Sequence, residues 1–244
     1  MLCPMNLLLL SSQATLQILS ARDPRLEHVR GVLRLGPGDS FDVGAENGPR
    51  GRATILSANR ESLEVTVKWG DHPPPPAPID LLVALPRPAT ARKIIMDATT
   101  LGVRSIHFFT SGKSDPAYAH SRFWTAGGWE EARRLGAEQA FSTWLPRTIL
   151  HGSMSAALGA CNPEQQERWA LDVYEGSQRM GNLPPQKAES VILAFGPERG
   201  WNATDRTALR AAQFTLCSMG ERVLRLETAV AAGLALILAR QGVL

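Results

Sequence analysis

Cysteine is scarce in this chain of 244 residues, which contains only Cys3, Cys161 and Cys217. Because the number is odd and no two cysteines form a CxxC pair, we expect neither a disulfide framework nor a structural zinc site. Free thiols are typical of a reducing compartment. The cysteine content therefore predicts a cytoplasmic protein without a structural metal.

Long apolar runs are also lacking. The longest, residues 229–239, has eleven residues, whereas a membrane-spanning helix needs about 20. The first ten residues include four consecutive leucines but no basic leader, which makes a poor signal peptide. We therefore expect a soluble protein.

A strong charge of one sign is absent as well, since 26 Lys and Arg stand against 23 Asp and Glu, for a net charge of +3. This balance permits a polyanionic partner but does not require one. Basic residues do gather locally, at Arg22, Arg25, Arg30 and Arg34. Such clustering is the feature that would favour a nucleic-acid partner.

Several enzyme motifs are missing. The chain has no GxGxxG, Walker, HExxH or GxSxG sequence. A Rossmann dinucleotide site, a P-loop, a zinc protease centre and a hydrolase nucleophile elbow are therefore not indicated.

Proline divides the chain at residues 73–78, which read PPPPAP and favour an extended, stiff linker. Short apolar or alternating segments separated by Gly, Pro and Asn precede it, a pattern typical of a small β-barrel. There we expect strands at residues 6–10, 40–43, 52–57 and 63–69, and a helix at 24–30.

Strands and helices alternate after the linker, which predicts an α/β domain with a mainly parallel sheet. We expect strands at residues 79–85, 105–109, 191–195 and 215–216. We expect helices at 91–101, 129–145, 204–212 and 226–240, an irregular loop at 152–165, and a helix around 164–174. Asn202 with Asp205 three residues later is a variant of the capping box.

Two glycine-bearing segments follow expected strands. Residues 196–200 read GPERG, and residues 219–228 read MGERVLRLET. Ligands of open α/β sheets bind at the carboxyl ends of strands, where glycine lets the backbone approach closely. Each segment taken alone is equally well explained as an ordinary strand-to-helix turn.

Together, these two segments resemble the RsmE branch of the SPOUT methyltransferases, in which GPExG precedes LGxRxLRxET. Three further stretches are similar to that family: Lys93 with residues 97–103, Glu138-Gln139-Ala140 with Leu145-Pro146, and His28 with residues 32–34 and 38–39. The resemblance covers nearly the whole chain. Two positions depart from the family pattern, since Arg199 stands where a second glycine is common and Gly112 where an acid is common.

The resemblance implies an α/β fold with a SPOUT-type, trefoil-knotted, mainly parallel sheet, preceded by a small PUA-like β-barrel. It implies an RNA-binding barrel at 1–72, the linker at 73–78, and a methyltransferase domain at 79–244. The knot loops would lie near residues 85–87, 195–201 and 217–225, and the protein would be a homodimer.

The resemblance also implies a reaction, the transfer of a methyl group from S-adenosyl-L-methionine to N3 of a uridine in 16S ribosomal RNA of the small subunit. The cofactor would be held mostly by the backbone of the knot loops. Its expected contacts are Leu85, Pro86, Phe195, Gly196, Pro197, Glu198, Gly200, Leu216, Ser218, Met219, Gly220, Val223, Leu224, Arg225, Glu227 and Thr228. Taken alone, Leu216 and Leu224 are better explained as ordinary core residues.

Glu198 and Arg225 are the expected catalytic residues. Uridine N3 carries a proton at neutral pH, which Glu198 could accept, while Arg225 could stabilise the developing anion. Alternatively, Glu198 holds a turn and Arg225 forms a structural ion pair. The expected RNA contacts are Arg22, His28, Arg30, Arg34, Lys93, Lys113, Arg122, Gln139 and Arg147. For any single Arg or Lys among them, a solvated surface charge is the better explanation.

Two rival functions stay open. The chain could methylate a different RNA, which the atypical segment 111–123 would allow. It could instead be a non-catalytic RNA-binding or ribosome assembly factor that kept the fold, which Arg199 in the cofactor loop would allow.

Overall fold

A computed structural model describes residues 7–27, 29, 31, 34–161, 166–184 and 186–244. The chain forms two compact units. One comprises residues 1–75 and 137–145, and the other comprises residues 76–136 and 146–244. Within the described residues, no helix is long and apolar enough to cross a membrane.

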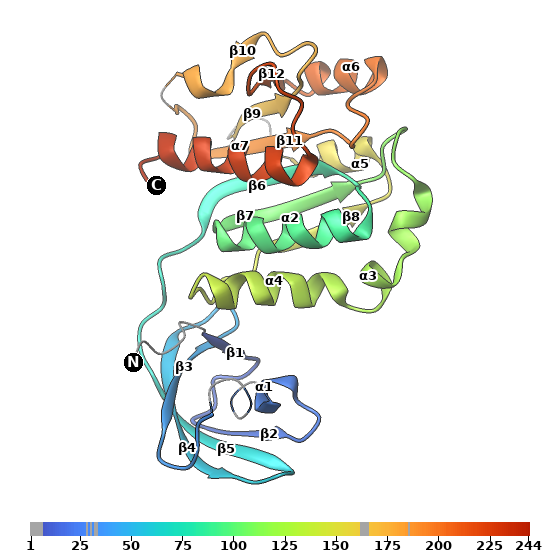
Figure 1. The fold of residues 1–244 in the computed structure, drawn as a ribbon. Helices are drawn as coiled ribbons and strands as arrows, with labels where there is room; N and C mark the ends of the chain where they lie inside the picture. The colour runs from blue at the N-terminus through green and yellow to red at the C-terminus, as the bar shows by residue number, and fades with distance from the viewer. Residues whose placement is uncertain (1–6, 28, 30, 32–33, 162–165, 185) are drawn as a thin grey trace. The chain divides into compact units, whose positions relative to one another are not determined.

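The first unit is built on a five-stranded sheet with the order β1-β3-β4-β5-β2 (Figure 1). Only the β1–β3 pair is parallel among these strands. Alternate residues of β3, β4 and β5 are buried in one apolar cluster, which explains why these strands alternate in sequence. The elements are β1 (Leu8–Leu10), β2 (Leu16–Ser20), α1 (Pro24–Glu27), β3 (Ser40–Ala45), β4 (Arg50–Ala58) and β5 (Ser62–Trp69).

Residues 137–145 belong to this first unit. Helix α4 (Gly128–Gln139) ends well before Pro146, so the prediction of a helix over 129–145 is wrong beyond Gln139. Phe141 has a φ of 53°, outside the helical region. Buried Thr143 then donates from Oγ1 to the Gly48 carbonyl at 2.6 Å, and Glu138 accepts from the Leu9 amide at 3.1 Å. These tertiary bonds end the helix early.

The second unit contains a seven-stranded sheet with the order β10-β12-β9-β11-β6-β7-β8 (Figure 1). Every strand pair in it is parallel, which confirms the expected α/β fold. The central strands β6 and β11 are buried on both faces and are therefore mostly apolar, with Asp80 and Ser190 as buried polar exceptions. The strands are β6 (Ala77–Ala84), β7 (Val103–Phe109), β8 (Arg147–His151), β9 (Gln166–Leu171), β10 (Gln178–Arg179), β11 (Ser190–Phe195) and β12 (Thr215–Ser218).

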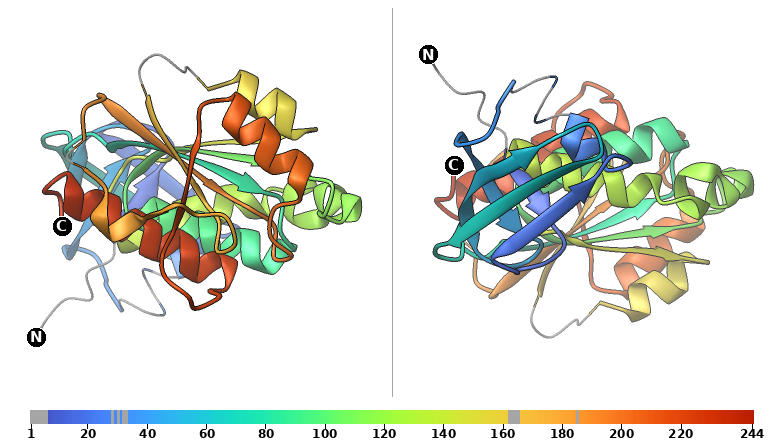
Figure 2. Two further views of the ribbon diagram at one scale, coloured as in Figure 1. Left: turned by 90° about the horizontal axis from the view of Figure 1, so that it is seen from above. Right: turned by 90° about the horizontal axis from the view of Figure 1, so that it is seen from below.

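Helices cover both faces of this sheet, as Figure 2 shows. Helices α2 (Pro88–Thr100) and α7 (Leu226–Arg240), with the first part of α4, pack on one face. Helices α5 (Met154–Gly159) and α6 (Ala203–Ala211) pack on the other. Shorter elements are α3 (Arg122–Thr125) and the 3-10 turns η2 (Pro116–His120) and η4 (Met180–Asn182).

One prediction for this unit fails. Where we expected a helix around 164–174, residues Gln166–Leu171 form strand β9 between β11 and β12. The segment Arg168-Trp169-Ala170 is buried on both sides, and pairing with two neighbours outweighs its helix propensity. The irregular loop expected at 152–165 is also wrong in part, because residues Met154–Gly159 form helix α5. Strands β2, β8 and β10 and helix α3 were not anticipated. The other predicted elements are confirmed to within a few residues, except that residues 6, 28, 30 and 162–165 lie outside the described residues.

Candidate functional site

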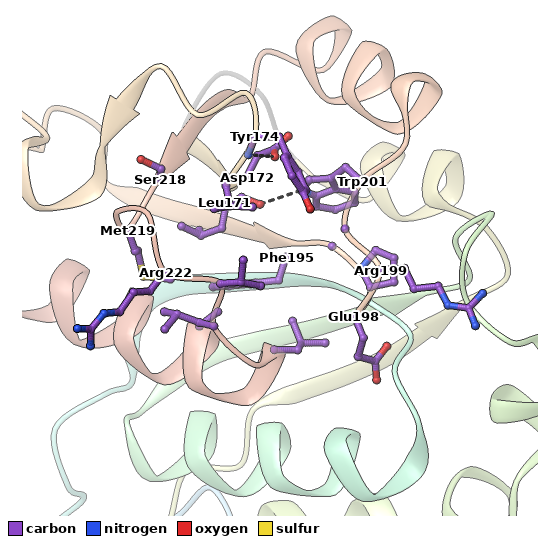
Figure 3. Close-up of a pocket in the computed structure, with 18 of the residues that line it drawn as sticks. Leu171, Asp172, Tyr174, Phe195, Glu198, Arg199, Trp201, Ser218, Met219 and Arg222 are labelled. Carbon is purple, nitrogen blue, oxygen red and sulfur yellow. Dashed lines mark hydrogen bonds between the residues drawn. The ribbon is translucent and has the colours of Figure 1, made fainter.

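A pocket of about 250 Å³ lies where three neighbouring parallel strands end. Its walls are the segments that follow β9, β11 and β12, together with the start of α7 (Figure 3). Strand carboxyl ends of a parallel sheet lie along one edge, so these segments converge although they are distant in sequence. This edge is the candidate functional site.

The segment after β11, residues 196–201, forms a tight turn. Gly200 has a φ of +69°, and its amide donates to the Pro197 carbonyl at 2.7 Å. Next to it, Asn202 and Asp205 exchange side-chain and backbone hydrogen bonds in a complete capping box, which starts α6. The capping prediction is therefore confirmed, and the cap fixes the far end of the turn.

Trp201 holds this turn against the sheet. Its ring stacks on buried Phe109 at the end of β7, with centroids 6.3 Å apart and planes 5° apart. Its Nε1 donates to the Leu171 carbonyl at 2.9 Å, at the end of β9. A Cβ at Gly196 would lie only 3.1 Å from the Trp201 ring, which explains glycine at that position.

The segment after β9 is held in place by an ion pair. Asp172 is 2% exposed in its side chain and pairs with Arg206 of α6 at 2.5 Å. Burial alone would raise the pKa of Asp172, but the Arg206 guanidinium and the Tyr174 amide bring that pKa below its ordinary value. A Cβ at Gly176 would lie 2.5 Å from the Asp172 carbonyl, so only glycine lets the chain turn back here.

The segment after β12 presents apolar side chains to the pocket mouth. Gly220 has a φ of +108°, which favours glycine in this turn. Val223 is 79% exposed and Leu224 is 36% exposed although both line the pocket. Exposed apolar residues around a concave site favour an apolar ligand or a partner surface.

Three charged residues that line the pocket, Glu198, Arg199 and Arg222, are exposed, whereas Asp172 is buried and paired with Arg206. Glu198 and Arg199 are both exposed, and Figure 3 shows them at the opposite end of the pocket from Arg222. Among the residues that the structure describes, no group of three or more His, Cys, Asp or Glu side chains could hold a metal ion. The interior is formed mainly by backbone and apolar atoms, which suits an uncharged ring system.

Ten of the expected cofactor contacts line this pocket: Phe195, Gly196, Pro197, Glu198, Gly200, Ser218, Met219, Gly220, Val223 and Leu224. The other expected contacts lie outside its lining. Leu85 and Leu216 are buried in the two apolar clusters that flank the sheet, and Pro86 is buried as well. Arg225, Glu227 and Thr228 lie at the start of α7, and Arg225 is exposed.

The expected RNA contacts are dispersed over exposed positions. Arg22, Arg34 and Gln139 are exposed in the first unit, and Lys93, Lys113, Arg122 and Arg147 are exposed in the second. His28 and Arg30 lie outside the described residues. Arg25, from the same arginine cluster, instead forms an ion pair with Asp23 at 2.5 Å and donates to the Leu9 carbonyl.

Sequence reasoning missed one wall of the pocket. Leu171 is the last residue of β9 and residues 172–174 follow it, and none of them was considered because this region was expected to be a helix. A short apolar run that ends at Asp172 and is followed by Gly176 is also the pattern of a buried parallel strand and its turn. The pocket residues that were not among the expected cofactor contacts are Leu171, Asp172, Val173, Tyr174, Arg199, Trp201, Arg222, Leu226 and Ala229, of which Arg199, Trp201 and Arg222 lie within the expected knot loops.

Comparison with known proteins adds to this geometry. Residues 73–238 match the model of the RNA methyltransferase domain family. The chain is 29% identical to a ribosomal RNA small subunit methyltransferase E of Treponema pallidum, over 96% of this chain and 91% of that protein. It is 23% identical to a ribosomal RNA small subunit methyltransferase E 1 of Borreliella burgdorferi, over 93% and 95%.

The fold is similar to that of solved structures. A ribosomal RNA small subunit methyltransferase E of Neisseria gonorrhoeae, bound to S-adenosyl methionine, superposes with a TM-score of 0.82 over 96% of this chain and 97% of that one, at 19% identity. A methyltransferase of Legionella pneumophila, also in complex with that cofactor, gives a TM-score of 0.81 over 95% and 96%, at 19% identity.

Proposed function

The chain belongs to the RNA methyltransferase family, in its RsmE branch, and on this premise we propose that it transfers a methyl group from S-adenosyl-L-methionine to N3 of a uridine in 16S ribosomal RNA. One observation carries the proposal. The GPERG and MGERVLRLET segments, far apart in sequence, form two walls of one pocket at the carboxyl edge of the parallel sheet.

The residues present fit the cofactor. An adenine ring suits an apolar slot with backbone donors and acceptors, and the segments after β11 and β12 supply both around Met219, Val223 and Leu224. Leu85, Pro86 and Leu216 would support these segments from behind, and Glu227 and Thr228 would hold the start of α7. When bound, the cofactor supplies a methyl group that its sulfonium already activates.

The protein then has to position uridine and remove a proton. Glu198 is exposed on the pocket wall, where its carboxylate can accept the N3 proton directly or through water. Arg225 is exposed at the N-cap of α7, and we propose that it stabilises the uridine anion as it forms. Positioning supplies the remaining rate enhancement.

The target base has to be accessible. N3 lies on the Watson–Crick edge, so the uridine must be unpaired or flipped out of a helix. Exposed Lys93, Arg122 and Arg147 in the sheet unit, and Arg22 and Arg34 in the first unit, would contact phosphates. We propose that residues 1–72 are a PUA-like RNA-binding barrel joined by the linker 73–78 to the methyltransferase domain 79–244.

Two features of the family are part of the proposal. A trefoil knot would involve the segments after β6, β11 and β12, and the sheet order supports it because β11 lies between β9 and β6. A homodimer would cover apolar side chains that are exposed near the pocket and on the last helix, including Val223 and Leu236.

Two other functions are kept as alternatives. Arg199, in place of a second glycine, favours a non-catalytic RNA-binding or assembly factor. The atypical segment after β7 favours methylation of another RNA.

Methyl transfer from labelled S-adenosylmethionine to small ribosomal subunits from cells that lack the protein separates the three functions. We expect N3-methyluridine in 16S RNA, with the product nucleoside identified by mass spectrometry. An absence of transfer despite cofactor binding would point to a different RNA as the substrate. An absence of transfer together with an absence of cofactor binding would favour the RNA-binding factor.

A further inference from the structure

Lys113 was expected to contact RNA, but its side chain makes a different contact. Its Nζ donates to the carbonyl of Arg199 at 3.0 Å and lies 3.4 Å from the carbonyl of Trp201. These two carbonyls flank Gly200, the residue with positive φ in the pocket turn. The ammonium group therefore bridges both ends of the sharpest part of that turn.

The segment that carries Lys113 is itself well held. Buried Ser111 accepts from the Lys113 amide at 3.3 Å, and its Oγ lies 3.0 Å from Ser114 Oγ. The Ser114 amide donates back to the Ser111 carbonyl at 3.1 Å. Lys113 thus extends from a self-bonded turn that continues directly from β7, and not from a loose loop.

The same two segments also lie close together at Gly112. A Cβ at Gly112 would lie 3.4 Å from Nδ2 of Asn202, the N-cap of α6. The turn after β7 therefore lies beside the start of α6. The carbonyls of Arg199 and Trp201 are thereby within reach of the lysine side chain.

We propose that Lys113 is a positioning residue that ties the segment after β7 to the turn at residues 196–201 and so holds the cofactor pocket in its binding shape. The inference rests on the proposed function for the identity of the ligand. Trp201 anchors the inner side of the turn through its ring and Nε1, and Lys113 anchors the outer side. Without Lys113, the carbonyls of Arg199 and Trp201 lose a cationic donor that no neutral side chain replaces fully.

The test compares Lys113→Met with Lys113→Arg and with Lys187→Met, an exposed lysine elsewhere in the same unit. Isothermal calorimetry with S-adenosylhomocysteine should give a Kd about three- to tenfold weaker for Lys113→Met, since a charge-assisted but solvent-exposed bond is lost. Lys113→Arg should recover part of the affinity, and Lys187→Met should bind like the wild type.

Hydrogen–deuterium exchange provides a readout that does not depend on the cofactor. We expect faster exchange of peptides that cover residues 196–202 in Lys113→Met, with unchanged exchange in β6 and α2. If the wild type binds no S-adenosylhomocysteine but this exchange still rises, the positioning role stands and the proposed function fails.

RNA binding separates positioning from a phosphate contact. A phosphate contact predicts weaker RNA affinity with a salt dependence reduced by about one ion, and unchanged cofactor affinity and exchange. That combination would overturn the inference.

Discussion

The Asp172–Arg206 pair offers the sharpest test of how the pocket is held. Asp172 is 2% and Arg206 is 12% exposed in their side chains, and Arg206 reaches both carboxylate oxygens, at 2.5 and 3.3 Å. Removing one member of a buried ion pair typically costs 3–5 kcal/mol, because the other charge stays buried. In Asp172→Asn, Arg206 still has Glu175 as a partner at 3.4 Å, which places the expected cost at the lower end of this range. We therefore expect Asp172→Asn to lower the free energy of unfolding by about 3 kcal/mol.

Urea unfolding of a double-mutant cycle measures this interaction. The variants are Asp172→Asn, Arg206→Met and the double variant, and we expect a coupling energy of about 1–3 kcal/mol, in the range found for residues in contact. Asp42 and Arg52 form a matched exposed pair, with 41% and 55% exposure, for which Asp42→Asn should cost less than about 1 kcal/mol.

The pH dependence follows from the lowered pKa of Asp172. Its contribution to stability is complete above the pKa of an unfolded aspartate, roughly 3.9. The contribution is lost as the pH falls through the still lower pKa in the folded state. Asp172→Asn should therefore differ most from the wild type at neutral pH and least in strong acid.

Cofactor affinity completes this prediction, since Asp172 belongs to the pocket wall at residues 171–174. We expect Asp172→Asn to weaken S-adenosylhomocysteine binding even where the protein remains folded. The structural role of the pair would be refuted if Asp172→Asn lowered the free energy of unfolding by less than about 0.5 kcal/mol, no more than an ordinary surface substitution does. It would also be refuted if the effects of the two single substitutions simply added up in the double variant.

Two further predictions concern the turn after β11. Gly196→Ala places a Cβ 3.1 Å from the Trp201 ring, which is held in place by its own contacts, so we expect weaker S-adenosylhomocysteine binding by calorimetry and a free energy of unfolding in urea that is lower by about 1–3 kcal/mol. The control is Gly152→Ala, whose Cβ would meet nothing within 4 Å. Equal behaviour of the two variants would contradict the packing role of Gly196. Asn202→Ala removes the capping box of α6 and should lower the free energy of unfolding by about 1 kcal/mol, whereas an unchanged urea midpoint would contradict that role.

Local signals predicted much of the fold. The alternation in β5, the apolar run of β11 and the Asn202–Asp205 cap are short-range patterns, and each is confirmed. The parallel sheet followed from the alternation of such strands with helices. The central strands are buried on both faces, so their sequences are almost wholly apolar, as is found only in buried strands or core helices.

The sequence was ambiguous where long-range contacts decide the structure. Strand β9 carries Trp169 and Ala170 next to charged residues, a pattern that fits a buried strand and a helix equally well. Its pairing with β11 and β12 decides between the two. The early end of α4 depends on Thr143 bonding to Gly48, 95 residues away. The pocket wall after β9 was missed for the same reason.

The candidate site could be predicted where glycine and proline fix the backbone, at Gly196, Pro197, Gly200 and Gly220. The side-chain anchors of these segments could not, because Trp201, Lys113 and Arg206 act through partners that only the fold brings near. An exposed lysine in particular has the same sequence signal whether it binds phosphate or a carbonyl.

Binding of S-adenosylhomocysteine to the purified chain, measured by isothermal titration calorimetry, tests the proposed cofactor site most directly. We expect saturable binding with one ligand per chain, weakened by Gly196→Ala and unchanged by Gly152→Ala. An absence of binding to the folded wild type would contradict the cofactor site, and binding unaffected by Gly196→Ala would contradict its location.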